Sequence, residues 1–244
     1  MKEFDEPGYH GVDRHGRDFT ERAIRMAFIR KVYAILFVQI LITIAIICFV
    51  TFVTPVKTYV NDHVWVFWTA FGLTIFFIIL LACFVEIRRR LPWNYIFLIA
   101  FTILESFVLG YISSFYSWQS VLMAMGICAV VCLALTVFSF QTKFDFTTCG
   151  GMLFVSLIIF VVFGIFAGIF VVYVGNILYL VYAGIGAMLF SLYLVFDTQL
   201  MIGGKHKYAL SPEEYIFAAL NLYLDIVLLF LYILALLGGG GGNN

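Results

Sequence analysis

Long apolar stretches separated by short polar segments dominate this chain. A helix needs roughly 20 apolar residues to cross the hydrocarbon core of a bilayer. Seven stretches reach that length, and they predict spanning helices at 32–54, 64–85, 93–114, 118–138, 149–174, 177–201 and 213–237. The pattern therefore predicts an all-α membrane protein, built as a seven-transmembrane-helix bundle.

The segments outside these spans are short. A polar N-terminal arm at 1–31 precedes the transmembrane domain at 32–237, and a Gly/Asn-rich tail follows at 238–244. No short apolar core with a small-residue cleavage site lies in the arm, so we expect the first span to direct membrane insertion. The connections are too short to predict a second folded domain.

Two span boundaries carry specific signals. The arginine run Arg88–Arg90 ends the second span just before Pro92, and we interpret it as a stop-transfer anchor. The start of the seventh span is typical of a capping box, with Ser211 as N-cap, Pro212 as first helical residue and Glu214 reaching back to the cap. These signals define where the second span ends and where the seventh span begins.

Lys and Arg lie mainly on one side of the expected bundle. The N-terminal arm has seven and the second-to-third loop three; Lys143, Lys205 and Lys207 share their side, whereas the other side has Lys57. By the positive-inside rule the N-terminus is cytoplasmic and the C-terminus is lumenal or extracellular. The weakest boundary is the Gly-Asn pair at 175–176, where a single kinked helix would give six crossings instead of seven.

Composition agrees with a lipid-embedded chain. The sequence is 64% hydrophobic and 11% charged, which leaves too little polar surface for a soluble domain. The formal net charge is zero, so we expect the lipid bilayer, and no nucleic acid, as a partner. The sequence indicates no cofactor and does not predict an oligomeric state.

Three carboxylates lie inside predicted spans: Glu105, Asp197 and Asp225. A charge at the centre of a spanning helix costs about 2.5–3.5 kcal/mol, and no Lys or Arg lies deep enough in a span to neutralise these groups. They must be protonated, share protons, face water or bind a cation. Asn221 lies one turn before Asp225 and extends its polar stripe.

We expect Asp197 and Asp225 to meet, because consecutive antiparallel helices pack as neighbours. Two such carboxylates hold one proton between them and form a proton-controlled latch, which attracts calcium through its oxygens when deprotonated. The alternative is a protonated carboxyl that bridges helices structurally. Counting along the helices puts Asp197 about 9 Å and Asp225 about 15 Å from the cytoplasmic loop, so the meeting requires tilt or an offset helix start.

Three segments carry a resemblance to a known family. They are FDTQLMIGGKHKYALSPEEYIFAALNLYLD from Phe196 to Asp225, FTERAIRMAFIRKVYAILFVQILIT from Phe19 to Thr43, and QTKFDF at 141–146. Together they resemble the lifeguard branch of the transmembrane Bax inhibitor motif family, from about residue 19 to residue 236.

The resemblance implies a seven-helix protein of the endoplasmic reticulum or Golgi membrane, with the plasma membrane as an alternative, that leaks calcium and suppresses cell death. It also implies that Asp197 and Asp225 form a pH-sensitive latch over the ion path. An arginine of the second helix region holds that latch in the family, and here it would be Arg88, Arg89 or Arg90. The long Pro/Gly/Tyr-rich N-terminal region of many lifeguard members is missing, so partner binding that needs it is not implied.

The leading hypothesis is a pH-modulated passive calcium leak with Asp197 and Asp225 as gate and calcium site, and with Glu105 and Asn221 along the ion pathway. Calcium is then the transported ion, and the direction of the pH effect is not predicted. The main alternative is a non-conducting scaffold that inhibits cell death by binding death-receptor or Bcl-2-type membrane partners. A proton-coupled carrier also stays open, because gating carboxylates serve carriers as well.

Two further classes fit poorly. An intramembrane aspartyl protease would need Tyr-Asp and Gly-x-Gly-Asp contexts, whereas this chain has Phe196-Asp197 and Leu224-Asp225. We therefore expect no enzyme. A heterotrimeric-G-protein receptor has its N-terminus outside, which reverses the charge bias observed here.

Overall fold

The computed structural model of the protein describes the backbone of residues 12–203 and 207–239, and the side chains of residues 21–169, 177–203 and 207–238. Lys205 and the remainder of the N-terminal arm and tail lie outside the described residues. Within the described ranges the chain is helical and has no strand. Its elements are α1 Val12–Phe52, α2 Thr54–Asp62, α3 Val64–Cys83, α4 Val85–Arg89, α5 Trp93–Ser113, α6 Trp118–Gln141, the 3-10 turn η1 Phe146–Cys149, α7 Gly150–Ile202, the 3-10 turn η2 Pro212–Glu214, and α8 Tyr215–Gly239.

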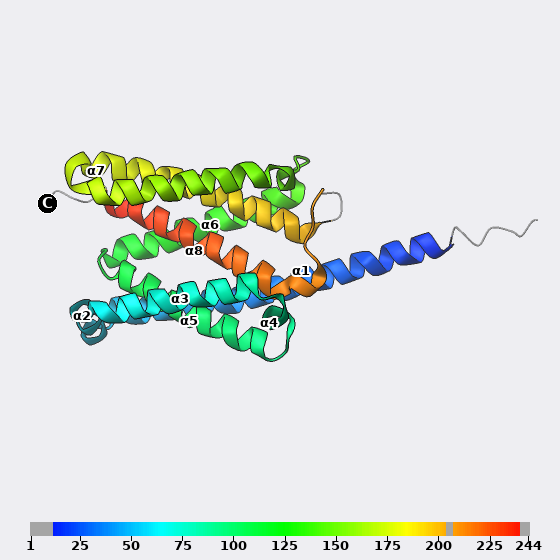
Figure 1. Cartoon of the computed structure of the whole chain (residues 1–244), viewed down its shortest axis with the longest axis horizontal. Coiled ribbons are helices and arrows are strands. Elements are labelled where there is room, and N and C mark those ends of the chain that lie inside the picture. Colours follow the sequence, from blue (N-terminus) through cyan, green and yellow to red (C-terminus); the bar gives the residue numbers. More distant parts are fainter. Residues whose placement is uncertain (1–11, 204–206, 240–244) are drawn as a thin grey trace, which may run out of the picture.

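The long element α7 folds back on itself and supplies two crossings (Figure 1). The ring of Phe160 stacks on the ring of Tyr182 with centroids 4.3 Å apart, and the ring of Phe196 lies against Gly150. These contacts make its first half (150–169) antiparallel to its second half (177–202). The side chains of the predicted turn at 175–176 lie outside the described ones. Within the described part of the chain, seven segments are thus long and apolar enough to cross a membrane, which confirms the seven-helix prediction.

Several helix ends differ from the predicted boundaries by two or three residues, and two differences have a visible cause. α1 begins at Val12, well before the predicted start at 32, because the arm continues the helix in good helix formers and Arg25 fixes it by donating to the carbonyl of Leu210 at 2.6 Å. α3 ends at Cys83, since the extended backbone of Phe84 interrupts the helix before the short α4. The arginine run therefore lies mostly on a separate turn.

α8 lies at the centre of the bundle and runs obliquely between α7 and the layer of α1, α3 and α5 (Figure 1). Tyr223, Leu220 and Leu234 on this helix are completely or almost completely buried. The outer helices instead expose large apolar side chains such as Leu133 and Ile159, as expected of surfaces that face lipid. The most deeply buried helix therefore carries the central carboxylate, Asp225.

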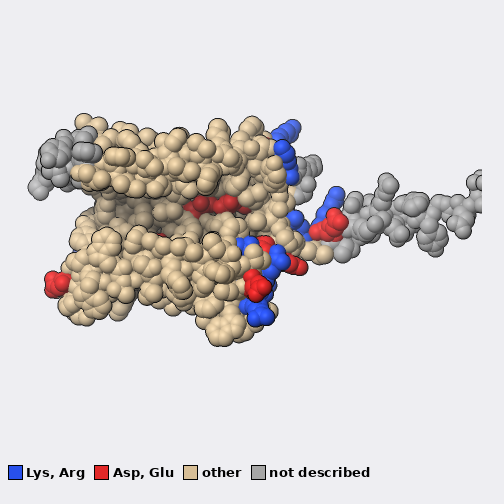
Figure 2. All heavy atoms as spheres, in the orientation of Figure 1, with Lys and Arg blue, Asp and Glu red and all other residues tan. Residues whose placement is uncertain are grey.

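Charged residues gather at one end of the bundle (Figure 2). We call this the charged end. Arg88, Arg89 and Lys31 lie there because they contact Glu214 and Tyr215 at the start of α8, and Lys207 lies there because its amide donates a hydrogen bond to Asp145 just before η1. The part of α1 that projects beyond the bundle leaves from this end, whereas α8 ends at the opposite end (Figure 1). The segregation agrees with the sorting of Lys and Arg that the sequence predicts, and the two ends agree with an odd number of crossings.

Candidate functional site

Asp197 and Asp225 meet in the interior. Asp197 lies on the second half of α7 and Asp225 on α8, and their side chains are 8% and 5% exposed. The two carboxyl groups lie close enough to each other to interact electrostatically. Because α8 runs obliquely (Figure 1), Asp197 and Asp225 can approach each other although they differ in their distance along the chain from the loop that joins their helices. Figure 2 shows acidic atoms inside the apolar band, away from the cluster of charged residues at the end of the bundle.

The surroundings of this pair supply little neutralising charge. Oδ2 of Asp225 is buried and accepts no hydrogen bond from any residue that the structure describes. Tyr193 lies near both carboxyls, and Cys132 lies near Asp225. The described Lys and Arg side chains form no ion pair with either aspartate. Two carboxyls in such a place are more stable when they share a proton than when both are ionised.

The other two predicted pathway residues lie apart from this contact. Glu105 on α5 is 8% exposed and lies near Tyr223 of α8. Asn221 lies one turn before Asp225 and is half-buried. Glu105 and the aspartate pair are therefore separate sites. Both lie along α8, because Glu105 is near Tyr223 and Asp225 is part of this helix.

Sequence reasoning missed a buried polar cluster beside Glu105. The hydroxyl of Thr43 contacts Ser106 Oγ at 2.9 Å and Tyr223 Oη at 2.8 Å, which links α1, α5 and α8. One turn away, Nε2 of Gln39 donates to Oγ1 of Thr102 at 3.0 Å. The only signal in the sequence is polar residues at helical spacing within apolar runs, which does not identify their partners.

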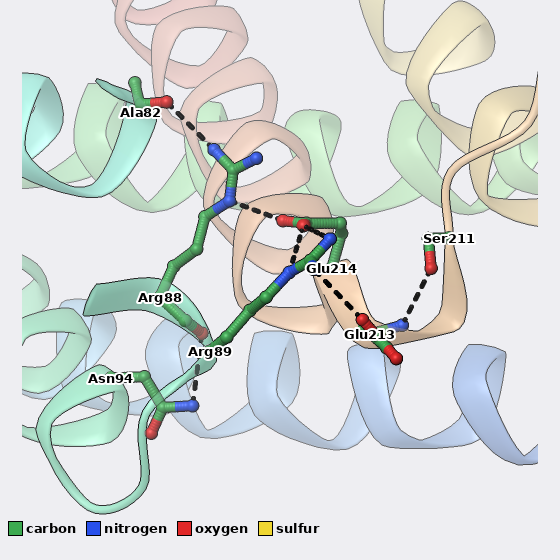
Figure 3. A network of polar contacts seen from close by, with 7 residues as sticks. All are labelled: Ala82, Arg88, Arg89, Asn94, Ser211, Glu213 and Glu214. Carbon is green, nitrogen blue, oxygen red and sulfur yellow. Dashed lines mark hydrogen bonds and ion pairs between the residues drawn. The ribbon is translucent and has the colours of Figure 1, made fainter. Parts of the chain in front are cut away.

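The three arginines proposed as latch partners lie at the charged end. Nε of Arg88 and Nη2 of Arg89 form ion pairs with Glu214, and Nε of Arg89 donates to Oε1 of Glu214 at 2.7 Å (Figure 3). Arg89 also pairs with Glu213 at 3.1 Å, whereas Arg90 is exposed. This network ties α4 to the start of α8, at a different place from the aspartate pair. A role for the arginines in holding that pair stays a prediction.

The network also changes the expected helix cap. Oγ of Ser211 accepts a hydrogen bond from the Glu213 amide at 3.4 Å, so the predicted start at Ser211 and Pro212 is confirmed. Glu214 was expected to reach back to the cap, but its carboxylate binds Arg88 and Arg89 instead. A charged partner gives a stronger hydrogen bond than a backbone amide, which explains this difference.

A second set of hydrogen bonds joins the segment before η1 to the end of α7, close to Asp197 in the chain. Gln199 is completely buried; its Oε1 accepts from the Phe146 amide at 2.7 Å and its Nε2 donates to the Phe144 carbonyl at 3.0 Å. Oδ2 of Asp145 accepts from the Lys207 amide at 2.9 Å. The QTKFDF segment before η1 therefore bonds both to the end of α7, at Gln199, and to the loop that follows α7, at Lys207. Gln199 lies two residues after Asp197.

No group of three or more His, Cys, Asp or Glu side chains that could hold a metal ion exists among the residues the structure describes. The two carboxyls of the aspartate pair supply at most four oxygens, which is fewer than the roughly six to eight that calcium takes in a resident site. A calcium ion there would need water or carbonyl oxygens as well.

Comparisons with known proteins match most of the chain. The chain matches the family model for "Inhibitor of apoptosis-promoting Bax1" over residues 25–242. It is 43% identical over 239 residues to Protein lifeguard 3 of Homo sapiens, covering 95% of this chain and 76% of that protein. It is 43% identical over 237 residues to Protein lifeguard 3 of Mus musculus, covering 94% and 76%. It is 39% identical over 220 residues to Bax inhibitor 1 of Schizosaccharomyces pombe, covering 89% and 78%.

Proposed function

This chain belongs to the Bax inhibitor family, in its lifeguard branch, and from that membership we propose that it is a pH-modulated passive calcium leak channel that suppresses apoptosis. Its membrane would be that of the endoplasmic reticulum or Golgi, with the N-terminus in the cytoplasm. Asp197 and Asp225 would form the gate.

One observation carries this proposal: two carboxyls meet inside the bundle with no described basic side chain paired to them. When one proton is shared, the pair bridges α7 and α8 and keeps the two helices together. When that proton leaves, like charges repel and the helices lose this bridge. Proton loss would also create oxygen ligands for a passing cation, so one pair of residues would sense pH and bind the ion.

A weak ion site suits a passive leak. An ion must bind well enough to enter a narrow path but must also leave it. Two carboxylates completed by water would hold calcium less tightly than a full protein cage. Glu105 and Asn221 would offer further oxygens along α5 and α8.

Cell protection separates this proposal from a non-conducting scaffold. We would express the wild type, Asp197→Asn and Asp225→Asn in cells, and measure survival after store calcium overload together with store calcium content. Asp62→Asn, at an exposed residue of the opposite end, is the matched control. We expect both buried substitutions to change store calcium and protection together, and the control to change neither. Full protection by both buried variants, with altered store calcium, would favour the scaffold.

A further inference from the structure

A basic side chain from α1 covers the end of α7. The last carbonyl groups of an α-helix have no partner within the helix. In α7 the carbonyls of Gln199 and Leu200 accept hydrogen bonds from backbone amides that follow the helix, at 3.0 and 2.9 Å. The carbonyl of Met201 accepts from Nη1 of Arg25 at 3.4 Å. Arg25 thus contributes to the cap of the helix that carries Asp197.

The same nitrogen of Arg25 also holds the segment that leads into α8. Nη1 donates to the carbonyl of Leu210 at 2.6 Å, and Leu210 directly precedes Ser211, the cap of η2. Hydrogen bonds from an ionised donor are shorter and stronger than neutral ones. One guanidinium therefore joins α1 to the end of the Asp197 helix and to the start of the Asp225 helix.

The backbone at Gly203 allows this approach. Its φ of +59° lies in the left-handed region, and a Cβ at this position would lie 3.0 Å from Cζ of Arg25 and 3.0 Å from Cβ of Ala209. Glycine is needed here both for the turn that ends α7 and for the space that the guanidinium occupies. The local backbone is thus shaped to admit Arg25.

The charge of Arg25 suits its position. The carbonyl end of α7 carries the negative end of the helix dipole, which a cation stabilises. Arg25 is partly buried, whereas Arg22, one turn earlier on α1, is exposed. Arg88 and Arg89 bind the end of α3 and the start of α8. Among the described residues, Arg25 is the basic side chain whose hydrogen bonds reach the helices of both aspartates.

This contact lies one helical turn from the aspartate pair. In an α-helix the amide of Met201 bonds back to the carbonyl of Asp197, four residues and about 6 Å earlier. Asp197 and Asp225 belong to different helices, so the distance between their carboxyls depends on how α7 and α8 are held together. Arg25 acts on these two helices at the end nearest to Asp197.

We propose that Arg25 is a positioning residue for the aspartate pair. Its guanidinium holds the end of α7 against the start of α8, and thereby sets the distance between the carboxyls of Asp197 and Asp225. The consequence for calcium rests on the proposed function: the gate opens more easily when Arg25 no longer holds the two helices.

Hydrogen exchange resolved to single amides tests the contact in the full chain. Arg25→Gln and Arg22→Gln each remove one positive charge from α1, but only the first removes a donor to α7 and α8. We expect the amide of Leu210 to exchange about ten- to hundredfold faster in Arg25→Gln, as for the loss of one hydrogen bond from a charged group, and to be unchanged in Arg22→Gln. The amide of Ser114, at the opposite end, should be unchanged in both, which excludes general unfolding. Equal exchange of Leu210 in wild type and both variants would overturn the proposal.

Infrared difference spectroscopy tests the positioning role, which a merely structural contact would not have. The carboxyl C=O band that is lost in Asp225→Asn reports on the surroundings of the pair. We expect this band to shift in Arg25→Gln and to keep its wild-type frequency in Arg22→Gln. An unchanged band together with faster exchange of Leu210 would show that Arg25 only stabilises the loop, and would overturn the proposal.

Arg25→Lys serves if Arg25→Gln does not fold. It keeps the charge but lacks the planar fork of arginine, so we expect the same two changes in smaller size. Wild-type exchange and a wild-type band in this variant would overturn the proposal. Neither readout measures calcium flux, so a wild type without a leak would contradict the proposed function and not the role of Arg25.

Discussion

Two neighbouring glutamates at the start of α8 have opposite surroundings. The side chain of Glu214 is 7% exposed and binds Arg88 and Arg89, whereas that of Glu213 is 70% exposed and pairs with Arg89 alone. Removing one partner from a buried ion pair leaves a charge without compensation, but an exposed pair contributes little. The two residues therefore form a matched test of the network in Figure 3.

Glu214→Gln should lower the free energy of unfolding by about 1–3 kcal/mol, because Arg88 and Arg89 are only partly exposed and keep their charge. Glu213→Gln should change it by less than about 0.5 kcal/mol. Thermal unfolding of the purified protein in detergent measures both. Equal effects at the two positions would contradict the account of this network.

The buried polar cluster gives a second test at this scale. Thr43→Val leaves the hydroxyls of Ser106 and Tyr223 with one partner fewer, and should destabilise the protein by about 1–3 kcal/mol. Thr69→Val is the control, since its exposed hydroxyl donates to the carbonyl of Trp65 in its own helix and does not link two helices among the described residues. A Thr43 variant as stable as the Thr69 variant would mean that the cluster contributes no stability.

The sequence singles out those candidate site residues whose side chains are rare in membrane-spanning helices. Asp197 and Asp225 stand out because ionisable residues are expensive in spanning helices. Thr43, Ser106 and Tyr223 are ordinary in such helices, so only their positions in space identify them as a cluster. Glu214 was expected to cap its own helix because local spacing favours that, and the nearby arginines are far away in sequence.

At the scale of helices, small residues decide how closely α7 packs. A Cβ added at Gly186 would overlap the rings of Tyr232 and Phe160, whereas one added at Gly184 meets nothing within 4 Å. The small residues in the second half of α7 therefore allow close packing on one side of the helix, against α8 and the first half of α7.

Gly186→Ala should destabilise the bundle by about 1–3 kcal/mol through overpacking. Gly184→Ala should leave stability unchanged or raise it by up to about 1 kcal/mol, because Ala is the better helix former. Thermal unfolding of the two variants compares them directly. The reverse order would show that this helix face packs differently from the structure.

Span number followed from the sequence, but helix ends did not. Apolar length fixes the segments that cross a membrane, and all seven exist. The N-terminal extension of α1 depends on the tertiary contact of Arg25 with Leu210, and the break at Phe84 has no proline or glycine to announce it. Contacts across the bundle decide such boundaries, and hydropathy does not report them.

At the scale of the whole molecule, the charge asymmetry predicts the topology. With the charged end on the cytoplasmic side, Lys207 and Asp62 lie on opposite sides of the membrane. Single cysteines at these positions, in a cysteine-free background, should react with an impermeant maleimide from opposite sides of sealed vesicles. Reaction of both from the same side would contradict the seven-crossing topology.

The central claim is that Asp197 and Asp225 together gate a calcium leak. The most direct measurement is calcium flux from proteoliposomes that contain the purified wild type, Asp197→Asn or Asp225→Asn, at several values between about pH 6 and pH 8, where coupled carboxylates can titrate. We predict a wild-type leak above that of empty liposomes that changes with pH, and a leak that is abolished or made pH-independent by either substitution. No leak above empty liposomes, or an unchanged pH profile in both variants, would contradict the account.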